Sequence, residues 1–340
     1  MHLAARPPDP TLNTRSSTAS SASNWPTGNG YRLDGQASAY YPPGYALALG
    51  ALFWLADLTP VTDDMHTGLV AGLNVGCQLV AVLATFAVAR RLVPGRRGAI
   101  AGLLAAALVA LWPNLIFHTS VVLTESLFLA LLLGTMFVAV SGPWGSGRVP
   151  PARLVTVGLL FGAATLVRPI SVPVLGALVL GWLVAGAGWR RALGRLAVVT
   201  GCTVAVLAPW VVRNAVVMDA VVLSTNTGDN LCMSRRVGGS GGFEFPNERC
   251  SRGPFDTLPR PALEAQRDAH GRRLALAFVV DHPAEEARLW FRRAQVTFDA
   301  DADGLSAAEA YGGNRSSPTG CDRRSRRLRT ATTPSSAPPP

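Results

Sequence analysis

A long stretch almost without charge constrains the fold of this chain more than any other feature. The fifty residues from 98 to 147 contain one charged side chain, Glu125. A soluble domain keeps most of its charged residues on its surface, so its chain does not produce an uncharged run of this length. A membrane-spanning helix needs about 20 apolar residues, because ~30 Å of hydrocarbon is crossed at a rise of ~1.5 Å per residue. The stretch therefore predicts a chain that crosses a lipid bilayer.

Apolar runs on both sides extend this pattern to about six membrane segments. Proline, glycine and arginine residues separate most of the runs, since they interrupt or end apolar helices. We therefore expect an all-α fold, a polytopic membrane helical bundle with a small extracytoplasmic C-terminal region and disordered tails. The expected segments are residues 66–89, 98–117, 119–141, 154–167, 169–188 and 194–212.

The arginines predict the orientation of this bundle. The net charge of +10 includes 31 arginines and no lysine. Nine arginines fall in one alternating set of short loops between the segments, and only Arg168 falls in the other set. Because arginine-rich short loops stay in the cytoplasm, we expect a multi-pass protein of the cell membrane whose two terminal regions are both extracytoplasmic. The same reasoning disfavours a nucleic-acid partner, because topology already accounts for the basic residues.

Composition divides the chain into five parts. Residues 1–28 are rich in serine and threonine and we expect them to be disordered. Residues 29–65 are expected to form an extracytoplasmic loop with a short interfacial helix, and residues 66–212 the transmembrane bundle. Residues 213–300 form an extracytoplasmic loop and helical region, and residues 301–340 a disordered tail rich in Arg, Pro, Ser and Thr.

One amphipathic helix is expected near the end of this outer region. Asp281-His282-Pro283 indicates the end of one helix and the start of the next, because proline favours a first helical position. Apolar residues then recur at helical spacing and form a single face. We expect this face to pack on the membrane domain or at the membrane interface; its residues are Ala287, Trp290, Phe291, Ala294 and Phe298.

The cysteines favour a disulfide over a metal site. None of the five has the CxxC spacing of zinc or thioredoxin motifs. Cys232 and Cys250 lie eighteen residues apart in a predicted outer loop, where oxidising conditions allow a bridge. We favour that disulfide over two free thiols. The histidines show no metal-ligand spacing, so no cofactor is identified and a divalent metal requirement stays open.

Two lone charges at membrane depth are candidate site residues. Arg168 follows a segment of only 14 residues, and its planar guanidinium suits a phosphate group. The alternative is an arginine that ends a helix and extends to the interface. Glu125 could transfer protons or orient a loop; we favour a structural carboxylate paired with Arg168 or Arg213.

Two outer motifs add further candidates. Tyr41 and Tyr45 flank a stiff Pro-Pro-Gly turn, which suits a carbohydrate or a lipid headgroup, although aromatic residues also anchor proteins at membrane interfaces without any ligand. Arg213 and Asn214 follow the sixth segment. Arg213 is a candidate second phosphate ligand, and the alternative is a cation that complements the end of a helix.

Five motifs in order resemble the GT-C class of integral membrane glycosyltransferases. The resemblance is to the bacterial branch related to protein O-mannosyltransferases and lipid A aminoarabinose transferases, and it covers residues 28–300. It implies transfer of a sugar from a polyprenyl-phosphate donor to an extracytoplasmic acceptor, with Arg168 and Arg213 binding the phosphate. The matching stretches are Gly28–Tyr31 with Ala39–Tyr45, Leu123–Phe128, Leu166–Pro169, Pro209–Asn214 and Leu223–Leu231.

The chain departs from that pattern at both ends. The first membrane helix and the acidic motif that supplies the general base do not occur upstream of Gly30. We therefore expect a truncated and catalytically incomplete copy, with the residues before about 28 and after about 312 read out of frame. The alternatives are a transporter or flippase-like membrane protein, and a non-catalytic membrane scaffold.

Overall fold

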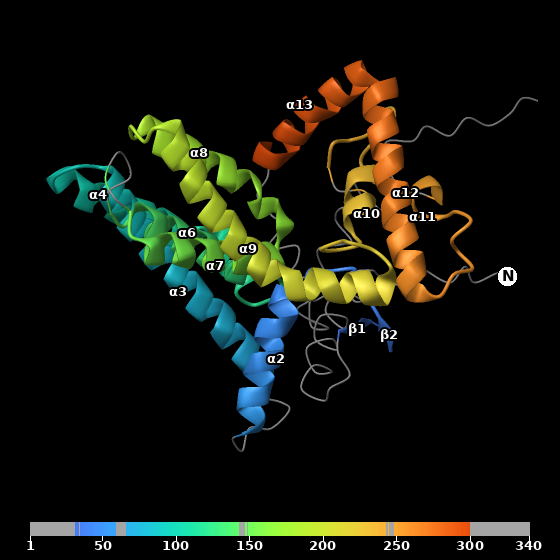
Figure 1. Cartoon of the computed structure of the whole chain (residues 1–340), viewed down its shortest axis with the longest axis horizontal. Helices are drawn as coiled ribbons and strands as arrows, with labels where there is room; N and C mark the ends of the chain where they lie inside the picture. Colours follow the sequence, from blue (N-terminus) through green and yellow to red (C-terminus); the bar gives the residue numbers. More distant parts are fainter. Residues whose placement is uncertain are drawn as a thin grey trace, which may run out of the picture.

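The computed structural model describes residues 31–33, 35–58, 66–142, 147, 149–242, 244 and 248–299 (Figure 1). Within these residues the chain is helical apart from loops and one small hairpin. The hairpin pairs β1 (Arg32–Leu33) with β2 (Gln36–Ala37) in antiparallel register. The predicted all-α class is confirmed. The tails expected to be disordered lie outside the described residues.

A helix occupies each of the apolar segments. Proline sets several boundaries, because it fits the first turn of a helix but removes a hydrogen bond from the interior. The helices are α2 (Gly44–Asp57), α3 (His66–Leu92), α4 (Arg96–Leu111), α5 (Pro113–His118), α6 (Glu125–Val140), α7 (Pro151–Val167), the 3₁₀ turn η2 (Pro169–Ser171), α8 (Pro173–Val184) and α9 (Trp189–Met218). We refer to α3–α9 as the bundle.

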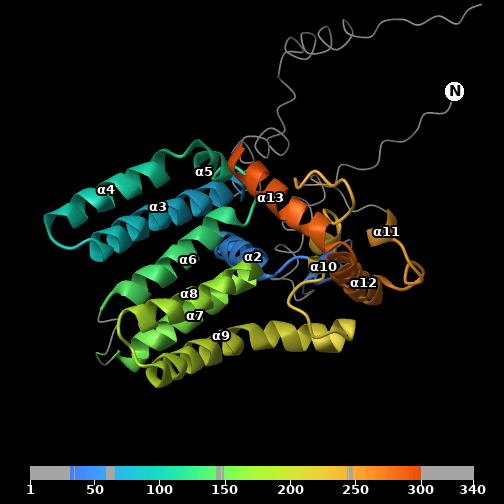
Figure 2. The same cartoon turned by 90° about the horizontal axis from the view of Figure 1, so that it is seen from above.

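The remaining helices form a polar C-terminal module, which we define as the described residues from 219 to 299. It contains α10 (Thr227–Cys232), α11 (Glu248–Ser251), α12 (Arg260–Asp281) and α13 (Pro283–Asp299). In Figures 1 and 2 this module lies beyond the C-terminal end of α9, at one end of the bundle. Helix α2 packs against α7 and α3.

The bundle helices lie side by side and alternate in direction along the chain (Figure 2). Helix α3 packs against α4 and α6, and α7 packs against α6 and α9. Small residues allow the closest of these contacts. Gly158 of α7 lies against Val199 and Cys202 of α9, and one turn later Gly162 lies against Val206. This close packing leaves the large side chains of most bundle helices to point outward.

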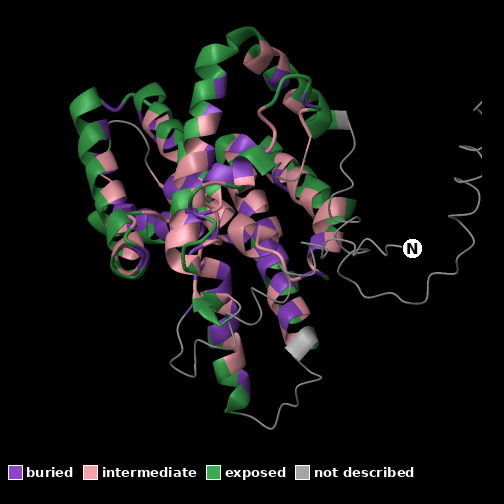
Figure 3. Cartoon of the chain, turned by 90° about the vertical axis from the view of Figure 1, so that its right-hand side faces the viewer, coloured by how far each residue is buried: buried purple, intermediate pink, exposed green. Residues whose placement is uncertain are grey.

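The outward faces of the bundle are apolar. Large aliphatic side chains there are about half exposed or more, and Figure 3 shows exposed residues in green along the helices. A soluble monomer rarely leaves so much contiguous apolar surface in water. The exposed residues include Leu79 and Leu83 on α3, Leu103, Leu104 and Leu108 on α4, Leu159 on α7, Leu180 on α8, and Val204 and Val212 on α9.

Within the part of the chain that the structure describes, two helices are long and apolar enough to cross a bilayer by themselves. They are Gly68–Leu92 in α3 and Trp189–Met218 in α9. Only 33% and 22% of their most apolar windows are buried, whereas the central helix of a soluble core would be mostly buried. Other bundle helices are apolar but shorter, with 12 residues in α8, 16 in α6 and 17 in α7.

The sixth segment extends further than the sequence predicted. It was expected to end near residue 212, but α9 continues through Pro209 to Met218. Side chains of this last part bind the chain that follows the helix. Trp210 Nε1 donates to the carbonyl of Leu223 over 2.8 Å, and Asn214 Nδ2 donates to that of Val222 over 2.9 Å. These contacts stabilise a helix that local propensity alone would end at the proline.

Candidate functional site

Arg168 is positioned by a break between two helices. Pro169 cannot continue α7, so the residue before it takes an extended conformation with φ of −146°. The N–H of Arg168 still donates to the carbonyl of Ala164, and the hydroxyls of Thr165 and Ser171 lie 2.7 Å apart across the break. The side chain of Arg168 therefore leaves the bundle at a fixed point, at the end nearest the C-terminal module.

Glu125 meets Arg168 at this point. Glu125 is the first residue of α6, where a carboxylate complements the positive end of the helix dipole. Its Oε1 accepts a hydrogen bond from Arg168 Nη1 at 2.5 Å, and the Arg168 guanidinium lies 6.0 Å from the centre of the Phe128 ring. Thr124 Oγ1 is a more distant acceptor at 3.4 Å. This geometry agrees with the favoured interpretation of Glu125 as the carboxylate partner of Arg168.

The guanidinium of Arg168 is not fully used by this pair. All of its hydrogen bonds to described residues involve Nη1, which leaves Nη2 and Nε without a partner among those residues. The side chain remains 39% exposed, and that of Glu125 29%. Pairing with Glu125 lowers the cost of placing a cation beside apolar helices, because the two charges cancel. Half of the guanidinium fork can still bind an anion.

Helix α2 brings the Pro-Pro-Gly turn against the same break. A side chain on Gly44 would begin 2.7 Å from the backbone of Leu166 and Val167, so only glycine allows this approach. The next residue, Tyr45, is 1% exposed, and its hydroxyl donates to Asn74 Oδ1 over 3.0 Å. The structure thus gives Tyr45 a buried hydrogen-bonding role, and its assignment to a ligand stays a prediction. Its hydroxyl is already satisfied inside the structure.

Arg213 and Asn214 connect the end of α9 to the β1–β2 region. Arg213 Nη1 donates to the carbonyl of Ser38 at 2.7 Å and to Asn214 Oδ1 at 2.9 Å, and Nη2 donates to the carbonyl of Tyr31 at 3.0 Å. The guanidinium also stacks 4.9 Å from the Trp210 ring, and Asn214 is fully buried. Backbone carbonyls occupy both terminal amino groups of Arg213, and the assignment of the two residues to a substrate stays a prediction.

The tyrosines before the turn lead to a group of carboxylates that the sequence did not reveal. Tyr41 is partly exposed, and its ring lies edge-on to that of Tyr40 at 4.9 Å. The hydroxyl of Tyr40 donates to Asp229 at 2.9 Å, and Asp229 is also paired with Arg267 at 2.9 Å. Burial, followed by the negative charge of Asp229, raises the pKa of Tyr40 above its ordinary range.

Two further carboxylates on α12 complete this group. Glu264 accepts hydrogen bonds from Ser38 Oγ, the N–H of Ala39 and Thr225 Oγ1, at 2.9–3.2 Å. One turn later, Asp268 accepts from the N–H of Gly228 and pairs with Arg272. Burial raises the pKa of Asp268, against the opposing effect of its hydrogen bond from Gly228. These carboxylates hold the N-terminal loop and the segment after α9 onto α12.

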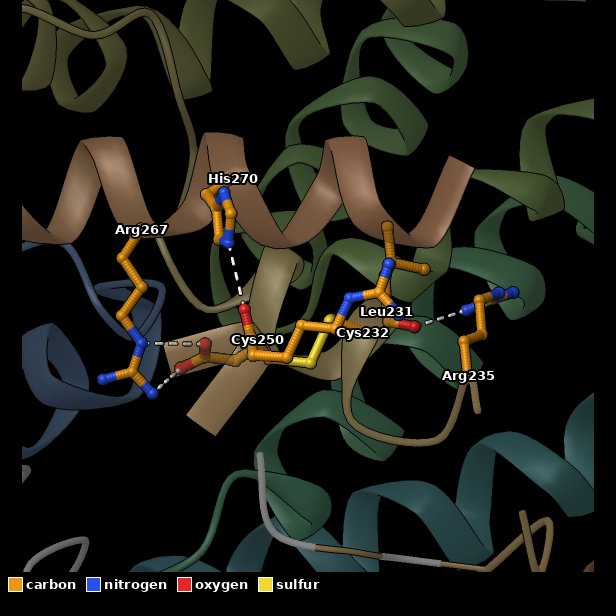
Figure 4. The surroundings of a disulfide bond; sticks show 8 residues. Leu231, Cys232, Arg235, Cys250, Arg267 and His270 are labelled. Atoms are coloured by element: carbon orange, nitrogen blue, oxygen red, sulfur yellow. Dashed lines mark hydrogen bonds and ion pairs between the residues drawn. A yellow bond between two sulfur atoms is a disulfide. The ribbon is translucent and has the colours of Figure 1, made fainter. Parts of the chain in front are cut away.

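A disulfide joins two of the short helices of the C-terminal module. Cys232 and Cys250 are bonded, with 6.0 Å between their Cα atoms, as we expected from their position in an outer loop. Figure 4 shows Arg235 donating to the carbonyl of Leu231 and the imidazole of His270 bonded to a backbone carbonyl, that of Arg249. The bridge therefore joins α10 to α11 beside α12. Within the described residues, no group of three His, Cys, Asp or Glu side chains is arranged to hold a metal ion.

Of the residues proposed from the sequence, the structure brings together Arg168 and Glu125, and it places Arg213 with Asn214 in a separate hydrogen-bond network. No protein-family model, curated protein or solved structure matches this chain. An interpretation of its function therefore depends on the geometry around Arg168 and on the apolar surface of the bundle.

Proposed function

We propose that the chain is a multi-pass membrane protein that binds the phosphate group of a polyprenyl-phosphate sugar through Arg168, as expected for a GT-C glycosyltransferase. The observation that carries the proposal is the partly open guanidinium of Arg168 at the end of an apolar bundle. Arginine binds phosphate with two N–H groups of its planar fork. Nη2 and Nε are adjacent on one edge of that fork and have no other partner among the described residues.

The apolar surface of the bundle supports membrane embedding. The exposed leucines and valines cover several helices, and a hydrocarbon environment removes the cost of leaving them in water. Exposed arginines gather at the turns of the opposite end of the bundle, away from Arg168; they are Arg90, Arg91, Arg96, Arg97 and Arg190. Arginines at one end of a bundle are typical of its cytoplasmic side. Arg168 would then lie at the extracytoplasmic end.

The bundle helices of 12 to 17 residues are shorter than a straight span of about 20. Adjacent ordered segments lengthen several of them: η2 precedes α8, and α5 follows α4 after a break at Trp112. Bilayers also thin locally around short helices at a modest cost. We therefore include six crossings in the proposal.

The proposal assigns donor binding to Arg168 and assigns no general base. Four carboxylates at this end are each paired with an arginine: Glu125 with Arg168, Asp229 with Arg267, Glu264 with Arg260 and Asp268 with Arg272. Each of these carboxylates uses oxygen atoms in its ion pair, which leaves fewer of them to accept the proton of an acceptor hydroxyl. This pairing favours a second candidate function, a scaffold that binds the lipid-linked sugar without transferring it.

Donor binding can be measured with the full chain in lipid nanodiscs that contain a polyprenyl-phosphate sugar. Arg168→Ala should weaken binding about 10- to 100-fold, because a hydrogen bond to a charged group contributes about 1.5–3 kcal/mol. Arg97→Ala is the matched control, since Arg97 is an exposed arginine at the other end. Equal affinity of the Arg168→Ala variant and the unsubstituted chain would rule out the phosphate site.

The same nanodiscs separate transfer from binding alone. Transfer of the sugar to an acceptor hydroxyl supplied in the assay, with release of polyprenyl phosphate, would identify a glycosyltransferase, and binding without such transfer would favour the scaffold. A transporter would instead move a solute across sealed vesicles whether or not the lipid donor was present.

A further inference from the structure

Among the described residues, one face of α13 contacts the rest of the C-terminal module. At the centre of that face, Leu289 is fully buried and lies against Gly239. Glu286 pairs with Arg235 at 3.0 Å and with Arg293 at 2.8 Å. Glu285 accepts from the N–H of Gly238 at 2.8 Å. The contacts of this face are therefore made with the loop that follows α10.

The opposite face of α13 is apolar and exposed. Trp290 is 62% exposed, Phe291 64% and Phe298 88%. At 100° per residue, these side chains and those of Ala287 and Ala294 occupy one side of the helix, and Leu289 lies on the other. The face that the sequence predicted is present, but the described part of the bundle does not cover these aromatic side chains.

We propose that this aromatic face of α13 lies in the headgroup region of the bilayer, on the membrane side nearest Arg168. The inference rests on the membrane embedding of the bundle proposed above. In Figures 1 and 2, α13 extends from α12 back in the direction of the bundle, whose helices also expose large aliphatic side chains. An exposed aromatic face on a helix that runs toward an embedded bundle argues for lipid rather than for a protein partner.

The chemistry of the helix also fits a lipid interface. Tryptophan and phenylalanine with arginine on the flank are typical of helices that lie in the plane of a membrane. Such helices place their apolar side chains about 5–10 Å into the boundary between headgroups and acyl chains. Bound in this way, α13 would hold the C-terminal module at a fixed tilt over the bundle.

Spin labels can test this contact in the full chain. Cysteine would replace Phe291 on the aromatic face, and Arg292, which contacts Gly241 on the module side, is the matched control. The thiols of Cys77, Cys202 and Cys321 would first be replaced by serine. In nanodiscs of phosphatidylethanolamine and phosphatidylglycerol, collisions of each label with apolar oxygen and with a water-soluble nickel chelate are compared. We expect a ratio of oxygen to nickel collisions several-fold higher at 291 than at 292.

A third label at Leu104, which is 63% exposed on α4, separates the two proposals. A lipid-like ratio at 104 with a water-like ratio at 291 would overturn the inference about α13 and leave the embedded bundle intact. A water-like ratio at 104 would instead overturn the proposed embedding. Protection of the label at 291 from both reagents would show that protein covers this face, either a second copy or another segment of this chain, and would also overturn the inference.

Discussion

At the scale of single residues, the structure shows which charged side chains pair with each other and which bind backbone groups. Glu125 and Arg168 are 43 residues apart, and each is the lone charge of its apolar stretch. Their pairing could be anticipated, because an apolar environment favours two opposite charges in contact over two separate ones. The hydrogen bonds that occupy the guanidinium of Arg213 could not be anticipated. Its acceptors are the backbone carbonyls of Tyr31 and Ser38. Every residue has such a carbonyl, so the sequence does not show which ones will accept these bonds.

The Tyr40–Asp229 hydrogen bond predicts a loss of stability in alkaline solution. Burial and Asp229 raise the pKa of Tyr40 in the folded chain, whereas an unfolded tyrosine ionises near pH 10. A raised pKa in the folded state means that this stabilisation is complete below pH ~10 and falls as the pH rises above that value. We expect unfolding in detergent micelles to show a decrease in stability above pH ~10 that is smaller in the Tyr40→Phe variant.

Tyr41→Phe is the neighbouring control for this measurement and should keep the full decrease. Tyr40→Phe should also cost about 1–2 kcal/mol at neutral pH, because Asp229 loses a hydrogen bond in a buried position. Equal slopes for all three proteins above pH 10 would show that the ionisation of Tyr40 is not coupled to folding.

At the scale of helices, apolar runs and prolines predicted the elements well. The helix from Pro283 begins where the sequence placed it, and the short helix expected within residues 29–65 is α2, Gly44–Asp57. The extension of α9 was missed because Pro209 indicates a helix end, while the contacts that maintain the helix come from residues 222 and 223. Local pattern gives the elements, and contacts distant in sequence decide where some of them end.

The contact of α2 with α7 predicts a sharp difference between two glycines. A methyl group on Gly44 would begin 2.7 Å from the backbone of α7, which has no side chain there to move aside. Overpacking of this kind costs about 1–3 kcal/mol. Gly176 in α8 has nothing within 4 Å, and alanine there should be neutral or stabilising by up to about 1 kcal/mol. Thermal unfolding of Gly44→Ala and Gly176→Ala in the same detergent measures the difference, and similar midpoints would contradict the close contact.

At the scale of the whole molecule, the uncharged stretches predicted the bundle and the cysteines indicated the bridge, but the assembly of the C-terminal module was not predicted. Ser38 and Glu264 are 226 residues apart and lie within hydrogen-bond distance. Glu264 and Asp268 occupy successive turns of α12, a spacing that in most helices indicates a solvated surface. Here the same spacing lets the two carboxylates accept hydrogen bonds from loops that are distant in the sequence. A single sequence does not show which loops those will be.

The proposed topology makes a prediction that involves the whole chain. The turn before α4 and the C-terminal module are separated by α4 with α5 and then by α6, α7, α8 and α9. If each of these five units crosses the bilayer, residues 97 and 252 lie on opposite sides of it. Both positions are exposed arginines, so cysteine can replace either one without disturbing the core.

With Cys77, Cys202 and Cys321 replaced by serine, a membrane-impermeant maleimide should label Arg252→Cys in intact cells, and Arg97→Cys only after the membrane is opened. Labelling of both positions in intact cells would mean an even number of crossings between them. One of the short helices, such as α8 with its 12 residues, would then lie on the membrane surface. Arg168 immediately precedes η2 and α8, so this outcome would also change the depth at which its guanidinium could meet a lipid phosphate. The position of that single cation therefore depends on the path of the whole bundle.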